Sequence, residues 1–164
     1  AYRSIGINRN DFMSLIQIND NRPDDIKAIQ WLAFASNAFN VMVPFYADIE
    51  TTPDYLSNTT GEVSTDNFYW SSRMIAAMAD ASYKKSIFHI ERYQEHVLSK
   101  GHEIINRYDD MIQNEADTDK HLALKHEANL AVADMLKAAT SDTLGKVLYE
   151  LSNEMKNAYS RSDA

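Results

Sequence analysis

The stretch IQWLAFASNAFNVMVPFY, residues 29–46, decides the fold of this 164-residue chain. Its two ends are almost continuously apolar, whereas its middle is interrupted by Asn37 and Asn40. Short apolar runs separated by turn-forming residues are typical of buried β-strands that reverse direction. We therefore predict strands over residues 29–35 and 41–49. Because the connection between them is short, we expect the two strands to pair antiparallel.

The strand predicted over residues 41–49 contains Pro44. Proline has no backbone N–H to donate to a neighbouring strand, so Pro44 places this strand at a sheet edge or at a bulge. An earlier strand is predicted over residues 12–18, where both faces carry apolar side chains. That pattern is typical of a strand covered on both sides. The turn-forming residues 19–25 connect this strand to the next, which gives an antiparallel meander of three strands.

The second half of the chain contains no proline from residue 67 onward and is rich in alanine, leucine, methionine, lysine and glutamate. This composition favours helices. The apolar spacing predicts a long helix over residues 69–113, which begins with a stripe formed by Trp70, Met74, Ala77, Met78 and Ala81. One of residues 64–67 caps its start. Unbroken, the helix would be about 65 Å long, so we expect either a bend or break, for which Gly101 is the candidate, or a helix packed along a larger body. Two further helices are predicted, one over residues 118–138 and one that begins at Thr140 or Ser141.

These expectations define an α+β protein with a strand region over residues 1–68 and a helical region over residues 69–164. The polar residues 51–67 form a surface loop at the end of the strand region. We expect the helices to pack on the strands as one domain.

The formal net charge of the chain is −8. A surface of this sign repels phosphate backbones and anionic lipids, which argues against nucleic acid and membrane partners. The sequence contains no cysteine, so disulfides, zinc–thiolate sites and thiol catalysis are excluded within this chain. The absence of cysteine fits a cytoplasmic protein.

The five histidines do not form a recognisable metal motif. His89 and His96 lie two helical turns apart with Glu91 and Glu95 between them, but the sequence has neither a Glu-x-x-His nor a His-Glu-x-x-His pattern. Solvated helix faces account for this scatter of charged residues. We therefore predict no metal and no cofactor in this chain.

Asn37 and Asn40 are the notable polar residues within the apolar strand region. A buried amide without hydrogen-bond partners costs about 1–3 kcal/mol, so each asparagine needs a structural or functional reason to stand in an apolar segment. In one interpretation both form the turn between the strands. In the other, one of them points into a substrate pocket at the edge of the sheet.

An ordered set of segments in the first half resembles the dipeptidase A-like cysteine dipeptidases of the N-terminal-nucleophile hydrolase superfamily. The segments are YRSIGINR (2–9), MSLIQI (13–18), QWLAF (30–34) and VPFY (43–46), followed by Tyr69-Trp70 before the long helix. The sequence departs from the family pattern at Ser4, where the family tends to have proline, and at Asn10, where it has threonine.

The resemblance implies a catalytic mechanism and a larger fold. In the family an amino-terminal cysteine attacks the peptide carbonyl and its own α-amine serves as the base. The family's sheet belongs to an αββα sandwich, to which this chain would contribute late strands and the C-terminal helices. The resemblance places the cysteine upstream of this chain, so this chain alone is predicted to be inactive and to contain no catalytic residue.

Four residues are the candidates for substrate contact that follow from the resemblance: Arg9, Arg3, Asn37 and Asn40. Arginine can pair with a dipeptide carboxylate, and asparagine can donate to an oxyanion. The expected partners are a dipeptide substrate, the missing N-terminal part of the same protein, and further copies in a homo-oligomer. The alternative from another functional class is a non-catalytic helical module for interaction or oligomerisation.

Overall fold

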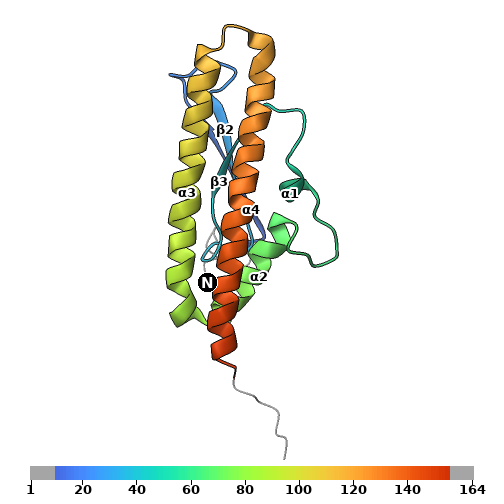
Figure 1. The fold of residues 1–164 in the computed structure, drawn as a ribbon, viewed down its shortest axis with the longest axis vertical. Helices are drawn as coiled ribbons and strands as arrows, with labels where there is room; N and C mark the ends of the chain where they lie inside the picture. Colours follow the sequence, from blue (N-terminus) through green and yellow to red (C-terminus); the bar gives the residue numbers. More distant parts are fainter. Residues whose placement is uncertain (1–9, 156–164) are drawn as a thin grey trace, which may run out of the picture.

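The computed structural model describes residues 10–155 of the chain (Figure 1). It has three strands followed by helices, so the predicted α+β class is confirmed. Helices α3 and α4 stand side by side and run in opposite directions, with the sheet behind them (Figure 1). The elements in chain order are β1 (Phe12–Ile18), β2 (Ala28–Phe34), β3 (Val43–Tyr46), α1 (Asp54–Ser57), α2 (Phe68–Ala81), α3 (Tyr83–Asn114), the 3₁₀ turn η1 (Thr118–Lys120) and α4 (His121–Asn153).

The strands form one antiparallel sheet in the order β1-β2-β3, which confirms the predicted meander. Leu15 of β1 lies opposite Trp31 of β2, and Trp31 lies opposite Pro44 of β3. Within the described sheet β3 pairs only with β2, so Pro44 lies on an edge strand, as its missing N–H requires.

A side chain of α4 closes the outer edge of β3. The backbone N–H of Tyr46 donates to Oδ1 of Asn129 over 2.9 Å, and Nδ2 of Asn129 donates to the carbonyl of Tyr46 over 3.1 Å. Asn129 has no exposed surface. Its amide thereby satisfies the donor and the acceptor that an edge strand leaves unpaired.

The prediction that the first strand is covered on both faces is wrong for this chain. All seven residues of β1 are exposed, and the strand contacts β2 but none of the helices between residues 10 and 155. The described helices pack against β2 and β3 but do not extend over β1. The large exposed apolar side chains of this strand are Phe12, Met13, Leu15, Ile16 and Ile18.

The long helix predicted over residues 69–113 is divided at Ser82, and the predicted bend at Gly101 is wrong. At Ser82 the hydroxyl donates to the carbonyl of Met78 over 2.9 Å and lies 2.5 Å from the hydroxyl of Ser86. Gly101 lies inside continuous α3, where a Cβ atom would stand 2.7 Å from Cδ of Pro44. The glycine therefore allows β3 to approach the helix closely.

The start of α2 confirms the predicted cap, since Oδ1 of Asn67 accepts from the N–H of Trp70 over 2.9 Å. The stripe predicted for this helix is displaced, because Ala77 and Ala81 are exposed whereas Ile75 and Ala79 are buried. The helix meets α4 more extensively than it meets the sheet, and that contact selects the buried face.

The two helices predicted after residue 118 form one helix, α4. Thr140 was expected at a helix start, but it lies buried inside α4 and donates to the carbonyl of Leu136 over 2.7 Å. Its hydroxyl also lies 2.7 Å from that of Tyr93 on α3. Within a helix a threonine hydroxyl can bond backward to the preceding turn, so it does not mark an end.

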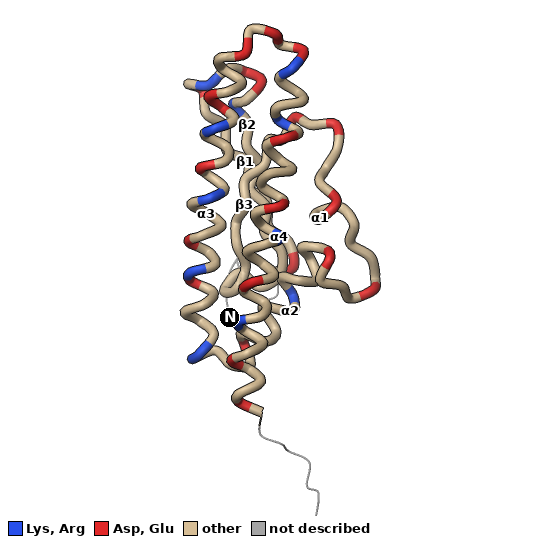
Figure 2. Tube along the Cα trace, in the orientation of Figure 1, with Lys and Arg blue, Asp and Glu red and all other residues tan. Residues whose placement is uncertain are grey.

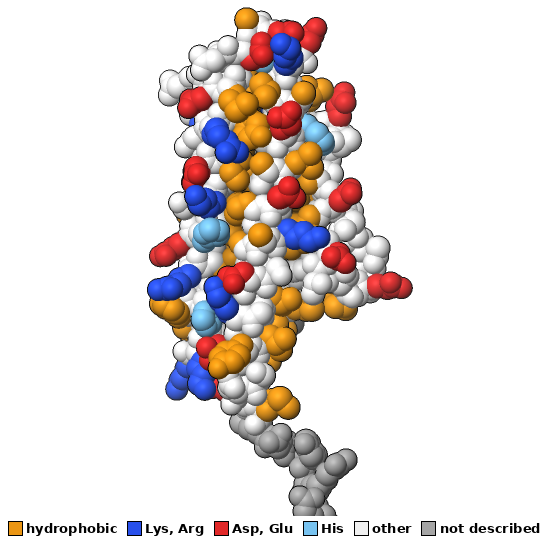
Figure 3. Space-filling view, viewed as in Figure 1, with side chains coloured by type: hydrophobic (Ala, Val, Ile, Leu, Met, Phe, Trp, Pro, Cys, Tyr) orange, Lys and Arg blue, Asp and Glu red, His pale blue; other side chains and the backbone are white. Residues whose placement is uncertain are grey.

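The surface of the helical layer is mixed in charge. Acidic and basic residues alternate along α3 (Figure 2), and apolar side chains gather along the seam between α3 and α4 (Figure 3). Within residues 10–155 no helix combines the length and the apolar character that crossing a bilayer requires.

Candidate functional site

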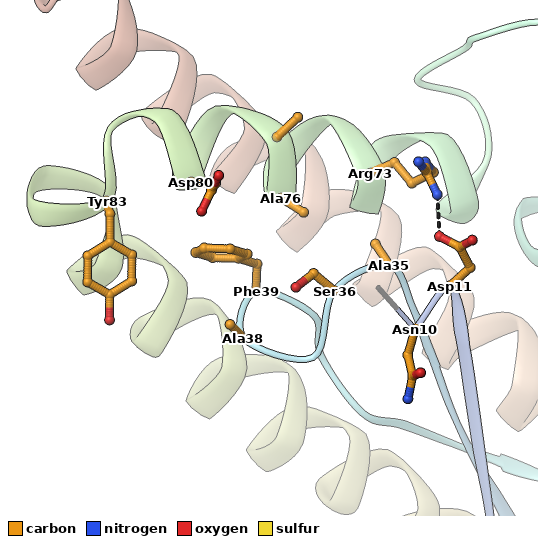
Figure 4. Close-up of a pocket in the computed structure, with 11 residues that line it drawn as sticks. Asn10, Asp11, Ala35, Ser36, Ala38, Phe39, Arg73, Ala76, Asp80 and Tyr83 are labelled. Carbon is orange, nitrogen blue, oxygen red and sulfur yellow. Dashed lines mark hydrogen bonds and ion pairs between the residues drawn. The ribbon is translucent and has the colours of Figure 1, made fainter. Parts of the chain in front are cut away.

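A hollow of about 640 Å³ lies at the end of the sheet where β1 begins and β2 ends (Figure 4). Asn10 and Asp11 lie on its β1 side, and the loop after β2 contributes Ser36 and Phe39. Helix α2 passes over it with Arg73 and Asp80, and Tyr83 lines it from the start of α3. Four separate segments of chain therefore build this hollow.

The loop after β2 is held in an unusual conformation. Ala35 has a φ of 66°, in the left-handed region that side chains other than glycine rarely adopt. This conformation costs about 1–2 kcal/mol, so contacts nearby have to stabilise it. The N–H of Ala35 donates to the carbonyl of Asp11 over 3.1 Å, and its own carbonyl accepts from Nδ2 of Asn40 over 3.2 Å.

Both asparagines predicted as site residues lie in this loop. Asn40 is buried and shapes the loop, because its side chain bonds Ala35 and its carbonyl accepts from Nε2 of Gln94 on α3 over 2.9 Å. Oδ1 of Asn37 is buried and has no hydrogen-bond partner among residues 10–155. Neither residue is among the described residues that line the hollow. The other two predicted site residues, Arg3 and Arg9, lie outside the described residues.

The two carboxylates that line the hollow differ in whether an ion pair compensates them. Asp11 forms an ion pair with Arg73, whose guanidinium also lies 5.7 Å from the ring centre of Tyr69. Asp80 forms neither an ion pair nor a side-chain hydrogen bond with any residue from 10 to 155. Among the described residues the hollow therefore carries one uncompensated carboxylate.

Aromatic rings form the part of the hollow near Asp80. Phe39 is buried, and its ring meets that of Tyr83 edge to face with 6.2 Å between centres. Figure 4 shows the Asp80 side chain pointing from α2 toward Phe39. A carboxylate beside two aromatic rings suits a ligand that is both cationic and partly apolar.

The sequence did not identify Asp11, Arg73 and Asp80 as site residues. The ion pair between Asp11 and Arg73 joins segments 62 residues apart. No spacing rule connects a strand start to a helix at such a separation. The proximity of Asp11 to the resembling segment YRSIGINR was the available signal.

A second polar cluster lies away from this hollow and connects the β1–β2 turn, β3 and α3. The hydroxyl of Tyr46 donates to Oδ1 of buried Asp109 over 2.7 Å. Nη1 of Arg22 lies 2.6 Å from Oδ2 of the same carboxylate, but the contact lacks the angle of a hydrogen bond. Burial raises the pKa of Asp109, while Tyr46 and Arg22 oppose that rise. The Asp109 carboxylate is held by one hydrogen bond and one ion pair within the described residues, so we interpret this cluster as structural.

Several histidines of the described chain bond neighbouring side chains. Nε2 of His89 lies 3.3 Å from a carboxylate oxygen of Glu150, and Nδ1 of His121 lies 2.5 Å from Asp25. Within residues 10–155 no group of three or more histidine or acidic side chains is arranged to hold a metal ion.

The described part of the chain is an α+β segment in which β1 forms one edge of the sheet, and comparison with known proteins identifies its family. A sequence model of Peptidase family C69 matches residues 1–96. The chain belongs to peptidase family C69.

Curated relatives extend the similarity over nearly the whole chain. A "Probable dipeptidase A" of Streptococcus pyogenes serotype M3 (strain SSI-1) is 39% identical over 163 residues, which cover 99% of this chain and 34% of that protein. A "Dipeptidase" of Bifidobacterium longum (strain NCC 2705) is 36% identical over 99% of this chain and 37% of its own length. A "Probable dipeptidase B" of Lactococcus lactis subsp. lactis (strain IL1403) is 33% identical, with 99% and 34% covered. The chain thus spans about a third of the curated relatives it matches, and its resemblance to the dipeptidase A-like family is confirmed.

Proposed function

We propose that this chain is the C-terminal part of a dipeptidase whose nucleophile is an amino-terminal cysteine outside the chain. The observation that carries the proposal is the match of 99% of this chain to about a third of proteins named dipeptidases. The absence of cysteine from all 164 residues agrees with a nucleophile supplied elsewhere.

In the proposed reaction the cysteine thiolate attacks the carbonyl of the peptide bond, and the α-amine of the same residue takes the thiol proton. An adjacent base activates a thiol in this way without a metal or another cofactor. The amine of the departing amino acid receives a proton, and water then releases the acylated half from the cysteine. The parent enzyme is accordingly a thiol protease, and we place it in the cytoplasm.

The contribution of this chain is a wall of the substrate pocket at the end of the sheet. The loop of residues 35–42 and helix α2 form that wall, and the strained Ala35 begins the loop. We assign Arg3 and Arg9 to the substrate carboxylate, which a guanidinium binds through two parallel hydrogen bonds. Asn37 and Asn40 stay the candidate donors to the oxyanion, although neither lines the hollow and one N–H of the Asn40 amide is already used by Ala35.

The rest of the parent completes the sheet in this proposal. Among residues 10–155, strand β1 has one unpaired edge and two exposed faces that carry large apolar side chains. Such an edge and such faces are stable in water when another strand and another layer cover them. The N-terminal part of the parent would provide both and produce the αββα sandwich.

The test is hydrolysis of dipeptides by the parent protein with its amino-terminal cysteine intact or replaced by alanine. We expect the intact protein to release free amino acids and the alanine variant to release none, with both proteins folded by circular dichroism. Equal hydrolysis by the two proteins would refute the cysteine mechanism. A folded intact parent that cleaves no dipeptide would favour the alternative of a helical interaction module.

A further inference from the structure

We propose that Asp80, together with the rings of Phe39 and Tyr83, binds the free α-ammonium group of the dipeptide. This inference rests on the proposed function and goes further, because it names the group that makes the site select an unblocked amino terminus.

The position of Asp80 supports the binding of a cation. It lies one residue before the end of α2, which closes at Ala81. The negative C-terminal end of α2 is offset by the positive N-terminal end of α3, which begins at Tyr83. The carboxylate of Asp80 itself is therefore the group that favours a cation at this place in the hollow.

The other charges of the hollow do not compete for this role. Asp11 and Arg73 compensate one another through their ion pair. Asp80 is exposed to the solvent of the hollow and has no cationic partner among residues 10–155. A ligand ammonium would supply the missing partner.

Aromatic rings strengthen the attraction for an ammonium group. The Phe39 ring lies below Asp80, and the Tyr83 ring stands beside it (Figure 4). The electrons of an aromatic face attract a cation, and they do so more strongly when water is displaced from between them. The rings also offer an apolar contact to the first carbon atoms of the bound residue.

The remaining wall leaves space for a substrate side chain. Alanines from the loop and from α2 line this part, namely Ala35, Ala38, Ala76 and Ala77. The hollow of about 640 Å³ lies within the range of roughly 300–1,000 Å³ that is typical of small-molecule sites. An amino acid residue with a free amine fits this combination of one carboxylate, two rings and small apolar side chains.

The experiment compares a dipeptide with its N-acetyl derivative on the full parent enzyme. The KM of the dipeptide and the inhibition constant of the acetylated form are measured for the wild type, Asp80→Asn and a control, Asp134→Asn. Asp134 is an exposed residue of α4 that does not line the hollow. Thermal unfolding of each variant verifies that it is folded.

We expect Asp80→Asn to raise the KM of the dipeptide by about tenfold with little change in kcat, because the charge interaction is made in the ground state and the transition state alike. The inhibition constant of the acetylated form should not change, and Asp134→Asn should behave as the wild type. Tyr83→Ala, a change at an exposed ring, should raise the KM of the dipeptide in the same sense but less.

An Asp80→Asn enzyme with the wild-type KM for the dipeptide would overturn this inference while the proposed function stands. Equal weakening of the dipeptide and its acetylated form would also overturn it, because the effect would then not depend on the amine. A wild-type parent that cleaves no dipeptide would overturn the proposed function itself, and this inference with it.

Discussion

The amide of Asn129 occupies the position that a neighbouring strand would otherwise take beside Tyr46. It reaches the edge of β3 from the first third of α4, across 83 positions of sequence. Both bonds are buried, so water cannot replace them if the side chain is lost. Buried polar groups without a partner cost far more than a satisfied hydrogen bond contributes.

We therefore predict that Asn129→Ala lowers the free energy of unfolding by about 3 kcal/mol, since it leaves one donor and one acceptor of β3 unpaired. Asn153→Ala, at the exposed end of the same helix, should change stability by less than about 0.5 kcal/mol. Urea denaturation followed by circular dichroism measures both. An Asn129→Ala variant as stable as the control would show that the Asn129 amide does not stabilise the edge of β3.

His121 gives a second prediction at the scale of a residue. Its Nε2 lies 2.9 Å from the carbonyl of Glu115 and its Nδ1 2.5 Å from Asp25, and both nitrogens can donate only in the protonated ring. The Glu115 carbonyl first, and then Asp25, raise the pKa of His121 above its ordinary 6.5. The folded state thus binds the proton more tightly than the unfolded state. The resulting stabilisation is complete below pH 6.5 and is lost as the pH rises through the folded-state pKa.

The measurement is the melting temperature of the wild type, His121→Gln and His96→Gln between about pH 5.5 and pH 9. We expect the wild type to lose more stability than His121→Gln over the upper part of that range. His96, which is exposed, serves as the control and should reproduce the wild-type profile. Parallel profiles for the wild type and His121→Gln would contradict this assignment.

At the scale of an element, α3 depends on a glycine where β3 comes closest. Glycine inside a helix ordinarily destabilises it by about 1 kcal/mol relative to alanine. At Gly101 that rule is reversed, because the Cβ of an alanine would lie 2.7 Å from Cδ and 3.0 Å from Cγ of Pro44. The pyrrolidine ring is stiff, so the helix and the strand would have to separate.

Two matched substitutions test this contact. Gly101→Ala should destabilise the protein by about 2 kcal/mol, because the added methyl overpacks the contact with Pro44. Gly145→Ala, where nothing lies within 4 Å of the added atom, should stabilise α4 by about 0.5–1 kcal/mol. Chemical denaturation measures the free energy of unfolding of both variants. A Gly101→Ala variant more stable than the wild type would contradict the close approach of α3 and β3.

Local patterns in the sequence predicted those elements whose boundaries depend on neighbouring residues. The meander, the edge position of Pro44 and the Asn67 cap all follow from backbone chemistry within a few residues. The division at Ser82 and the continuity of α4 through Thr140 depend on contacts with other helices, such as the one between Thr140 and Tyr93. The hollow could not be predicted, because Asp11 and Arg73 are brought together only by the tertiary fold.

At the scale of the whole molecule, the chain leaves one side of its sheet open. Strand β1 exposes apolar side chains on both faces, and within the described sheet its outer edge is unpaired. The family and the length of the relatives provide a reason, since about two thirds of each relative lies outside the matched region. The apolar pattern of residues 12–18 would then be explained by burial of this strand in the complete parent.

The isolated chain should accordingly associate into dimers or larger assemblies through β1. Ile16→Lys, which places a charge on its exposed face, should shift the population toward monomer, whereas Leu148→Lys on the exposed side of α4 should not. Light scattering over a range of concentrations measures this. A monodisperse monomer of the unaltered chain would count against missing neighbours at β1.

The most direct test of the central claim is to measure dipeptide hydrolysis by this chain alone and by the complete parent under the same conditions. In the proposed function the chain forms part of the pocket, and its sequence contains no thiol, so we predict release of amino acids by the parent and none by the chain. Hydrolysis by the purified chain would contradict the account, because a chain without cysteine would then contain its own nucleophile.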